Sequence, residues 1–316
     1  MATSALHKRA AKRRSLLRSY TNNWDLYLLL VPVLAYFIIF RYLPMAGVQI
    51  AFKDYYANKG IWGSPWVGMK HFARFFDGYY FSRLLGNTVI LSFLYLVFSF
   101  PAPIMLALAL NECRSTRFKR LVQTVTYAPH FLSTVVVVGL LMTMTSTRNG
   151  IVNELLKWAH GGGGHAIAFM YEEAWFRPLY IITGLWQETG WNTVIYMAAL
   201  TAIDPQLYEA AVVDGASRLR RIWHVTIPGI MPTMIVLLIL NSGKLMNVGH
   251  EKVLLMQNNL NIAASDIIST YVYRMGMQQG QYSFSSAVGL FNSVINTLLI
   301  VAVNMIAKRT GEVGLW

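Results

Sequence analysis

The stretch YLLLVPVLAYFIIF, residues 27–40, runs for fourteen residues without a charged side chain. A helix needs about 20 mostly apolar residues to cross the roughly 30 Å hydrocarbon core of a membrane. This stretch lies in a window of about that length, and five similar windows follow it along the chain. The sequence therefore predicts six transmembrane helices, near residues 26–43, 87–110, 121–145, 177–201, 229–250 and 286–307.

The distribution of charge also indicates a membrane protein. Of the 316 residues, 55% are hydrophobic and only 13% are charged, whereas a soluble globular protein is about 25% charged. The charged residues within the six windows are Arg41, Arg177, Glu188 and Lys244. We therefore expect an all-α polytopic membrane protein rather than a compact soluble enzyme. The expected divisions of the chain are a basic segment at 1–25, a transmembrane domain at 26–307 and a tail at 308–316.

The basic residues predict how the chain is oriented. The segments at 1–25, 111–120, 202–228 and 308–316 hold 15 Lys and Arg in 71 residues, and the alternate segments hold 9 in 109. Because Lys and Arg are enriched in cytoplasmic loops, both termini are predicted to be cytoplasmic. The basic N-terminal segment is expected to bind anionic lipid headgroups rather than nucleic acid.

Polar side chains inside the windows are the candidate functional residues, because such groups are costly in hydrocarbon and usually face a bundle interior or a water-filled cavity. They are Trp186, Gln187, Glu188, Trp191 and Asn192 in the fourth window and Asn241, Lys244 and Asn247 in the fifth. One interpretation is hydrogen bonding between helices, to which Asn292 and Asn296 of the sixth window would contribute. The other is a polar passage for a hydrogen-bonding solute, with the two tryptophans as stacking platforms.

Lys244 has more than one possible partner. In a passage it would suit the carboxylate of an acidic sugar, and it would equally suit an ion pair with Glu188 or Glu251. The chain has no phosphate-binding loop, no H-E-x-x-H motif and no nucleophile elbow. We therefore predict no catalytic residue, cofactor site or metal site, and the energy for active transport would come from another subunit.

The connection between the fourth and fifth windows, residues 202–228, reads AIDPQLYEAAVVDGASRLRRIWHVTIP. Asp204 is expected to cap a short helix that begins at Pro205. After a turn at Gly215, a second helix is expected to end before Pro228. The sequence thus predicts a small helix–turn–helix between two spans.

Part of this connection, EAAVVDGASRLRRIWHVTIP (209–228), resembles the EAA loop of permease subunits in binding-protein-dependent ABC importers. The matching residues are Glu209, Ala210, Ala211, Asp214, Gly215, Ala216, Ile227 and Pro228. The stretches TYAPHFLSTVVVVGL (126–140), NVGHEKVLLMQN (247–258) and STYVYRMG (269–276) are similar to the LplB-like branch of that family, which serves oligo- and polysaccharide importers of bacteria. The resemblance extends over residues 25–308.

The resemblance implies a six-helix type I importer permease in the bacterial inner membrane. It implies that the 209–228 motif docks as a coupling helix in a cleft of an ATPase. The implied partners are a second related permease, two ATPase subunits that carry ATP and Mg, an extracytoplasmic solute-binding protein, a saccharide and membrane lipid. The substrate expected is acidic and alginate-like, and a neutral oligosaccharide or glycerol phosphate is the alternative. A secondary transporter, a more distant alternative, would need internal repeats that the sequence does not show.

Overall fold

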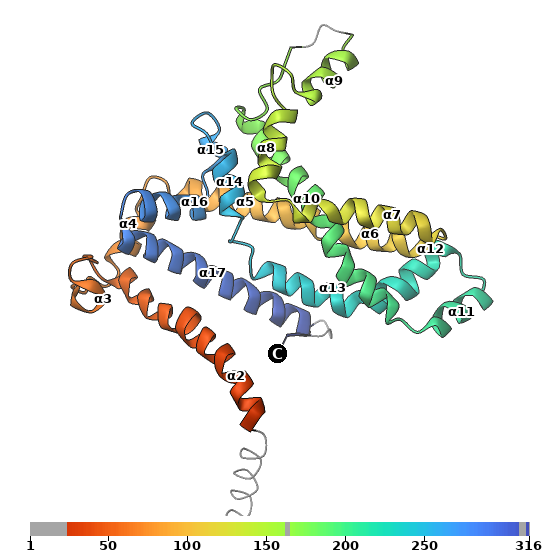
Figure 1. The fold of residues 1–316 in the computed structure, drawn as a ribbon, viewed down its shortest axis with the longest axis horizontal. Coiled ribbons are helices and arrows are strands. Elements are labelled where there is room, and N and C mark those ends of the chain that lie inside the picture. Colours follow the sequence, from red (N-terminus) through yellow and green to blue (C-terminus); the bar gives the residue numbers. More distant parts are fainter. Residues whose placement is uncertain (1–23, 162–164, 310–313, 316) are drawn as a thin grey trace, which may run out of the picture. The chain divides into compact units, whose positions relative to one another are not determined.

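The computed structural model describes residues 24–161, 165–309, 314 and 315 (Figure 1). Most of the expected segment 1–25 and part of the expected tail 308–316 lie outside the described residues. The chain divides into two compact units, Met1–Gly68 and Met69–Trp316. Regular structure in the described part is helical, apart from one isolated bridge.

The first unit contains a single long apolar helix. Its elements are α2 (Trp24–Phe37), η1 (Ile38–Tyr42), η2 (Leu43–Phe52) and the short α3 (Gly60–Gly63). The first three join into one helix of 29 residues whose most apolar window contains no buried residue. After this helix, Lys53 Nζ donates a hydrogen bond to the Ile61 carbonyl at 2.7 Å and lies 4.7 Å from the centre of the Trp66 ring. An apolar surface of this extent has to be covered by lipid or by another chain.

The second unit holds the remaining helices. They are α4 (Lys70–Phe76), α5 (Phe81–Ser99), α6 (Pro101–Glu112), α7 (Thr116–Tyr127), η3 (Ala128–Phe131), α8 (Thr134–Met144), α9 (Ile151–Ala159), α10 (Glu173–Thr201), α11 (Pro205–Val213), α12 (Arg218–Arg221), η4 (Ile222–Thr226), α13 (Ile227–Ser242), α14 (His250–Met256), α15 (Ile262–Ser265), α16 (Ile268–Tyr273), η5 (Arg274–Gln278) and α17 (Tyr282–Arg309).

Helix α10 is the centre of the second unit, and it packs against α5, α6, α7 and α13 (Figure 1). Near its start, Phe176 joins Leu91 of α5 in one apolar cluster. Near its end, Tyr196 joins Ile104 of α6 and Ile230 of α13 in another. A third cluster connects α4, α16 and α17. Burial of these side chains holds the bundle around α10.

Length and composition identify four of the described helical segments as candidate membrane spans. They are Trp24–Phe52, Phe81–Glu112, Arg218–Ser242 and Tyr282–Arg309, and the α7–α8 pair makes a fifth if it is counted as one span. Helix α10 covers the fourth expected window over 29 residues but carries Glu173, Arg177 and Glu188 and is not among them. The all-α membrane fold is confirmed, and the number six stays a prediction.

Two of the expected spans are interrupted. In the third, α7 and α8 are bent by 103° across η3. The fifth, expected to run to residue 250, ends as a helix at Ser242 and continues as turns and irregular chain over residues 243–249. These breaks leave backbone groups without helical hydrogen bonds, and in a membrane such groups need partners from neighbouring elements.

The prediction that a helix ends before Pro228 is wrong. Helices α12, η4 and α13 follow one another without a break from Arg218 to Ser242. Pro228 lies in the first turn of α13, directly after the π-helical turn η4. The widened turn changes the hydrogen-bond pattern ahead of the proline, so its missing N–H does not end the helix.

A buried carboxylate ties together three parts of the second unit. The Asp266 side chain is 0% exposed and accepts hydrogen bonds from Arg274 at 2.9 Å and from Arg83 of α5 at 3.2 Å. Asn87 donates to the Asp266 carbonyl at 3.1 Å, and Arg177 of α10 donates to the Asn87 side chain at 3.0 Å. The network therefore connects α5, α10 and the segment that contains α15 and α16.

Replacement of Asp266 by Asn is expected to lower the free energy of unfolding by about 2–3 kcal/mol, because two arginines then lose the anion that neutralises them inside the protein. Thermal unfolding of the detergent-solubilised protein measures this. The matched control is Glu154→Gln, which removes an exposed ion pair with Lys157 and is expected to change stability by less than about 1 kcal/mol. Equal effects of the two substitutions would contradict the structural role assigned to Asp266.

Candidate functional site

A polar cavity lies between α5, α10, the end of α13 and the irregular segment 243–249. Its volume is about 380 Å³. The polar residues that line it are Ser92, Tyr95, Ser99, Tyr180, Glu188, Asn192, Asn241, Lys244 and Asn247. A concave site with several amide and hydroxyl groups suits a solute that forms many hydrogen bonds.

The structure brings together five of the eight residues proposed for a solute passage. Glu188, Asn192, Asn241, Lys244 and Asn247 line the cavity, although they come from two helices and an irregular segment. The other three do not line it. Trp186 is 50% exposed, Gln187 donates to the Leu132 carbonyl at 2.9 Å, and Trp191 stacks on His130.

Two asparagines of α17 hold the irregular wall of the cavity in place. Asn292 donates to the Asn247 side chain at 2.8 Å, and the Met246 backbone N–H donates to Asn296 Oδ1 at 2.9 Å. Asn292 and Asn296 are buried. Of the two interpretations of the intramembrane polar residues, hydrogen bonding between elements therefore applies to this pair.

The two charged residues of the cavity have different surroundings. Glu188 Oε2 lies 3.1 Å from His130 Nδ1. Lys244 is exposed in the structure and forms no ion pair with any residue that the structure describes, so the ion pairs considered for it with Glu188 and Glu251 are not formed. Lys244 is thus a cation that is available to a ligand.

Sequence reasoning missed Lys252, which lies behind the cavity wall. It is only 8% exposed, and its Nζ donates to the Tyr180 carbonyl at 2.9 Å and lies 4.6 Å from the centre of the Tyr180 ring. Tyr180 in turn lines the cavity. The available signal was a lysine directly before the apolar run VLLM (253–256), which indicates a half-buried helix.

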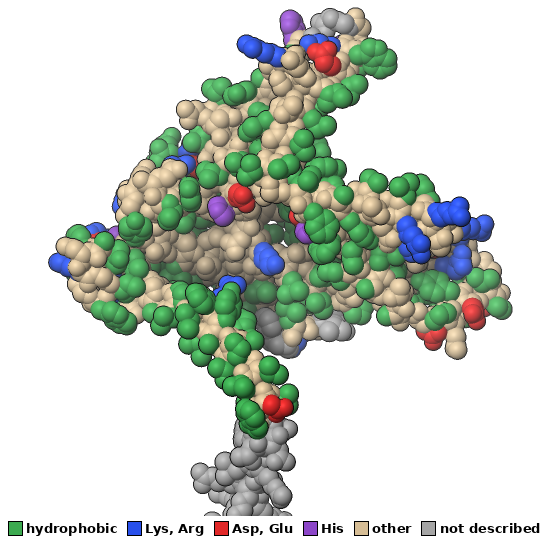
Figure 2. Space-filling view, in the orientation of Figure 1, with side chains coloured by type: hydrophobic (Ala, Val, Ile, Leu, Met, Phe, Trp, Pro, Cys, Tyr) green, Lys and Arg blue, Asp and Glu red, His purple; other side chains and the backbone are tan. Residues whose placement is uncertain are grey.

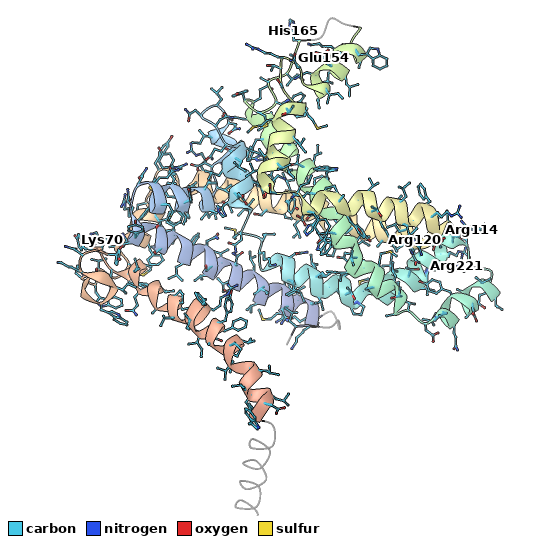
Figure 3. All side chains as sticks on the ribbon, in the orientation of Figure 1. Lys70, Arg114, Arg120, Glu154, His165 and Arg221 are labelled. Atoms are coloured by element: carbon cyan, nitrogen blue, oxygen red, sulfur yellow. The ribbon has the colours of Figure 1, made fainter. Side chains whose placement is uncertain are left out.

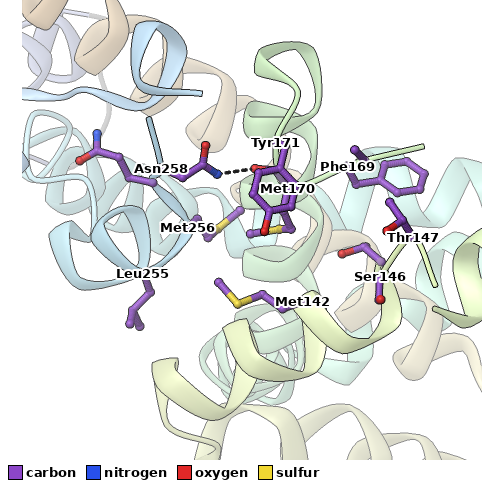
Figure 4. A pocket seen from close by; sticks show the side chains of 12 residues that line it. Met142, Ser146, Thr147, Phe169, Met170, Tyr171, Leu255, Met256 and Asn258 are labelled. Carbon is purple, nitrogen blue, oxygen red and sulfur yellow. Dashed lines mark hydrogen bonds between the residues drawn. The ribbon is translucent and has the colours of Figure 1, made fainter. Parts of the chain in front are cut away.

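A second pocket, of about 300 Å³, lies between the end of α8, the connection to α10 and the end of α14 (Figure 4). Its walls carry Met142, Met170 and Met256. Asn258 donates to the Met170 carbonyl at 2.7 Å, and this hydrogen bond joins the two segments that form the pocket. None of the residues that the sequence nominated for a solute passage or for the ATPase contact lines it.

The connection between α10 and α13 folds as a helix–turn–helix. Asp204 caps α11 by accepting from the Gln206 N–H at 2.9 Å. Gly215 has a φ of +72°, a left-handed conformation that glycine adopts without strain. The Tyr208 hydroxyl lies 3.1 Å from Thr226 Oγ1 and ties α11 to η4. The predicted cap and turn are therefore confirmed.

The residues of the EAA-like motif form an exposed surface on this element. Glu209, Ala210, Asp214 and Gly215 are exposed, and the neighbouring Val213 is 86% exposed. A hollow of about 260 Å³ beside them is lined by Ala211, Ala216, Arg220, Arg221, His224 and Val225. The surface thus combines small and apolar side chains with charged ones, a composition that protein interfaces also show.

Basic side chains gather at the same end of the second unit, over α6, α7 and α12 (Figure 2). Figure 3 labels Arg114, Arg120 and Arg221 there, whereas Glu154 and His165 lie at the α9 end. No ion pair to these three arginines is formed within the described part of the chain. This end therefore carries an uncompensated positive charge.

Residues 80–312 match the family of the binding-protein-dependent transport system inner membrane component. The match covers well over half of the chain, so the protein belongs to this family, which is the class of integral membrane permease subunits of ABC importers.

Two relatives from Bacillus subtilis (strain 168) are similar to the chain over nearly its whole length. The chain is 47% identical to the polygalacturonan/rhamnogalacturonan transport system permease protein YteP over 315 residues, which cover 100% of this chain and 97% of YteP. It is 50% identical to Protein LplB over 291 residues, which cover 92% of this chain and 91% of LplB.

Two solved structures are similar in fold. One is a bacterial ABC transporter involved in the import of the acidic polysaccharide alginate, with a TM-score of 0.86, 40% identity and coverage of 93% of this chain and 98% of that chain. The other is a bacterial alginate ABC transporter in complex with an alginate pentasaccharide-bound periplasmic protein, with a TM-score of 0.87, 39% identity and coverage of 94% and 99%. The protein is therefore a sugar ABC importer permease, a translocation subunit rather than an enzyme.

Replacement of Asn296 by Leu is expected to destabilise the protein by about 1–2 kcal/mol, because the buried Met246 N–H then loses its acceptor. The thermal midpoint of the detergent-solubilised protein should fall. Ser293→Ala is the matched control, since Ser293 lies on the exposed side of the same helix and bonds only to its own helix. A midpoint that Asn296→Leu leaves unchanged would show that the 243–249 segment does not depend on this hydrogen bond.

Proposed function

We propose that this permease imports an acidic oligo- or polysaccharide of the alginate or polygalacturonan type. The observation that carries the proposal is Lys244, a cation at the polar cavity that forms no ion pair with a described residue. The amide and hydroxyl groups around it suit sugar hydroxyls. The names of YteP and of the alginate importers support the same substrate class.

Charge favours a uronate over a neutral sugar at this site. Two unit charges 4 Å apart attract by about 4 kcal/mol at an effective dielectric constant of 20. Desolvation of the carboxylate offsets part of this energy. A neutral oligosaccharide would form hydrogen bonds with the polar groups of the cavity, and Lys244 could donate to its hydroxyls but would gain no ionic partner.

The complete importer requires further subunits. A second related permease would cover the apolar surface of the Trp24–Phe52 helix, and two ATPase subunits would bind ATP and Mg. An extracytoplasmic solute-binding protein would deliver the saccharide, which agrees with the periplasmic protein bound to the similar alginate transporter. The protein would lie in the cytoplasmic membrane with both termini in the cytoplasm and with anionic lipid against its basic N-terminal segment.

The helix–turn–helix between α10 and α13 would dock on an ATPase subunit. Glu209 would make a charged contact, small Ala210 and Ala211 would allow close approach, and Gly215 permits the turn. The helix that starts at Arg218 runs without a break to Ser242 and includes Asn241 of the cavity wall. Closure of the ATPases would therefore be transmitted along one continuous helix to the cavity.

Replacement of Lys244 by Gln is expected to lower the maximal uptake of an oligogalacturonate by about tenfold, which corresponds to loss of about 1.4 kcal/mol of favourable charge interaction. Uptake into proteoliposomes that contain the full transporter measures this. Lys157→Gln, which removes an exposed lysine far from the cavity, is the control and should retain uptake. Undiminished uptake by the Lys244 variant would rule out the proposed carboxylate contact.

Replacement of Glu209 by Lys is expected to abolish saccharide uptake while membrane insertion and yield stay normal, because the charge at the ATPase contact is reversed. Uptake and co-purification of the ATPase are the two measurements. Glu112→Lys makes the same charge change at the end of α6, outside the helix–turn–helix, and should retain coupling. Full uptake by the Glu209 variant would mean that this loop does not couple the subunits through Glu209.

A further inference from the structure

The break between α7 and α8 contacts residues 187–191 of α10. Gln187 donates to the Leu132 carbonyl at 2.9 Å. Gly190 lets the Thr126 backbone approach so closely that a Cβ at position 190 would collide with the Thr126 carbonyl. Through these contacts α10 supplies the close packing and the hydrogen bond that an irregular backbone needs in a membrane.

His130 lies in this break, between a carboxylate and an aromatic ring. Its Nδ1 is 3.1 Å from Glu188 Oε2. Its ring is parallel to the Trp191 ring, with an interplanar angle of 2° and centroids 4.6 Å apart, and Phe131 meets the same indole edge-on at 5.6 Å. The carboxylate and the indole therefore contact two different parts of the same imidazole, its Nδ1 atom and its ring face.

Glu188 of α10 contacts His130 in this break and also lines the polar cavity. Among the described residues that line the cavity it is the one acidic side chain, and Lys244 is the one basic side chain. An acidic saccharide in the cavity would be attracted by Lys244 and repelled by an unpaired Glu188. A transporter of uronates therefore has to neutralise this carboxylate.

We propose that His130 is a specificity-determining residue, because its ion pair with Glu188 masks the acidic group of the cavity and leaves Lys244 as the charge that an acidic saccharide meets. The inference rests on the proposed acidic substrate. Of the two lysines near this cavity, Lys252 bonds through its Nζ to the Tyr180 carbonyl, and Lys244 forms no ion pair with a described residue. His130 is thus the described residue that forms an ion pair with Glu188.

The test compares two substrates of equal length and different charge, trigalacturonate and its fully methyl-esterified form. Maximal uptake is measured in proteoliposomes that contain the complete transporter, with the binding protein saturated. His130→Gln is expected to slow trigalacturonate about tenfold and to change uptake of the ester by less than about twofold. The double variant His130→Gln with Glu188→Gln is expected to recover most of the lost trigalacturonate rate, since no carboxylate is left to be masked.

The variant Gln187→Leu distinguishes loss of the His130–Glu188 contact from a general loosening of the break between α7 and α8. It removes the hydrogen bond to the Leu132 carbonyl without a change of charge, so it should affect both substrates alike. If the wild type carries trigalacturonate but His130→Gln slows both substrates equally, or the double variant recovers nothing, the role of His130 is overturned while the acidic substrate stands. If the wild type carries the ester and not trigalacturonate, the proposed function fails, and the inference fails with it.

Discussion

A backbone that leaves the helical path inside an apolar bundle must find hydrogen-bond partners on neighbouring helices, and the second unit is organised around this constraint. Its helices break at two places, between α7 and α8 and over residues 243–249. Gln187 of α10 bonds to the first break, and Asn292 and Asn296 of α17 bond to the second. At both of these breaks, amide side chains of a neighbouring long helix therefore form hydrogen bonds with the irregular chain.

The second break also forms part of the wall of the polar cavity. Chain that is not helical turns Lys244 and Asn247 toward the cavity, and the same chain is anchored through Asn247 itself. The irregular residues that interrupt the fifth span are therefore also residues that line the polar cavity. The continuous helix from Arg218 to Ser242 connects this part of the cavity wall to the exposed helix–turn–helix. Such a connection suits a permease that is moved by a separate ATPase.

The charged groups of the described bundle differ in whether they have an ionic partner. Asp266 is shared by two arginines, and Glu188 is paired with His130. Lys244 stays without an ionic partner among the described residues although it lines a cavity. Pairing offsets part of the desolvation cost of Asp266 and Glu188, so Lys244 is the charged group of the cavity that a ligand can pair with.

Much of the fold followed from local patterns. Apolar windows indicated a helical membrane protein, and Asp204, Pro205 and Gly215 predicted a capped helix and a turn, because capping and left-handed turns depend on a few neighbouring residues. The local patterns did not predict where the third and fifth spans are interrupted, and they did not predict that the helix continues through Pro228. Whether a proline ends, bends or starts a helix depends on the elements that pack against it. The local sequence does not specify those elements.

The sequence by itself determined the class of the protein, since hydropathy, the distribution of basic residues and the 209–228 motif are properties of composition and spacing. It also nominated Glu188 and Lys244, because charges in a membrane are rare. Only the tertiary structure decided their partners. It paired Glu188 with His130, 58 residues away, placed Lys252 against Tyr180 and left Lys244 available, because an ion pair is formed by distance in space and spacing along one chain does not specify which helices meet.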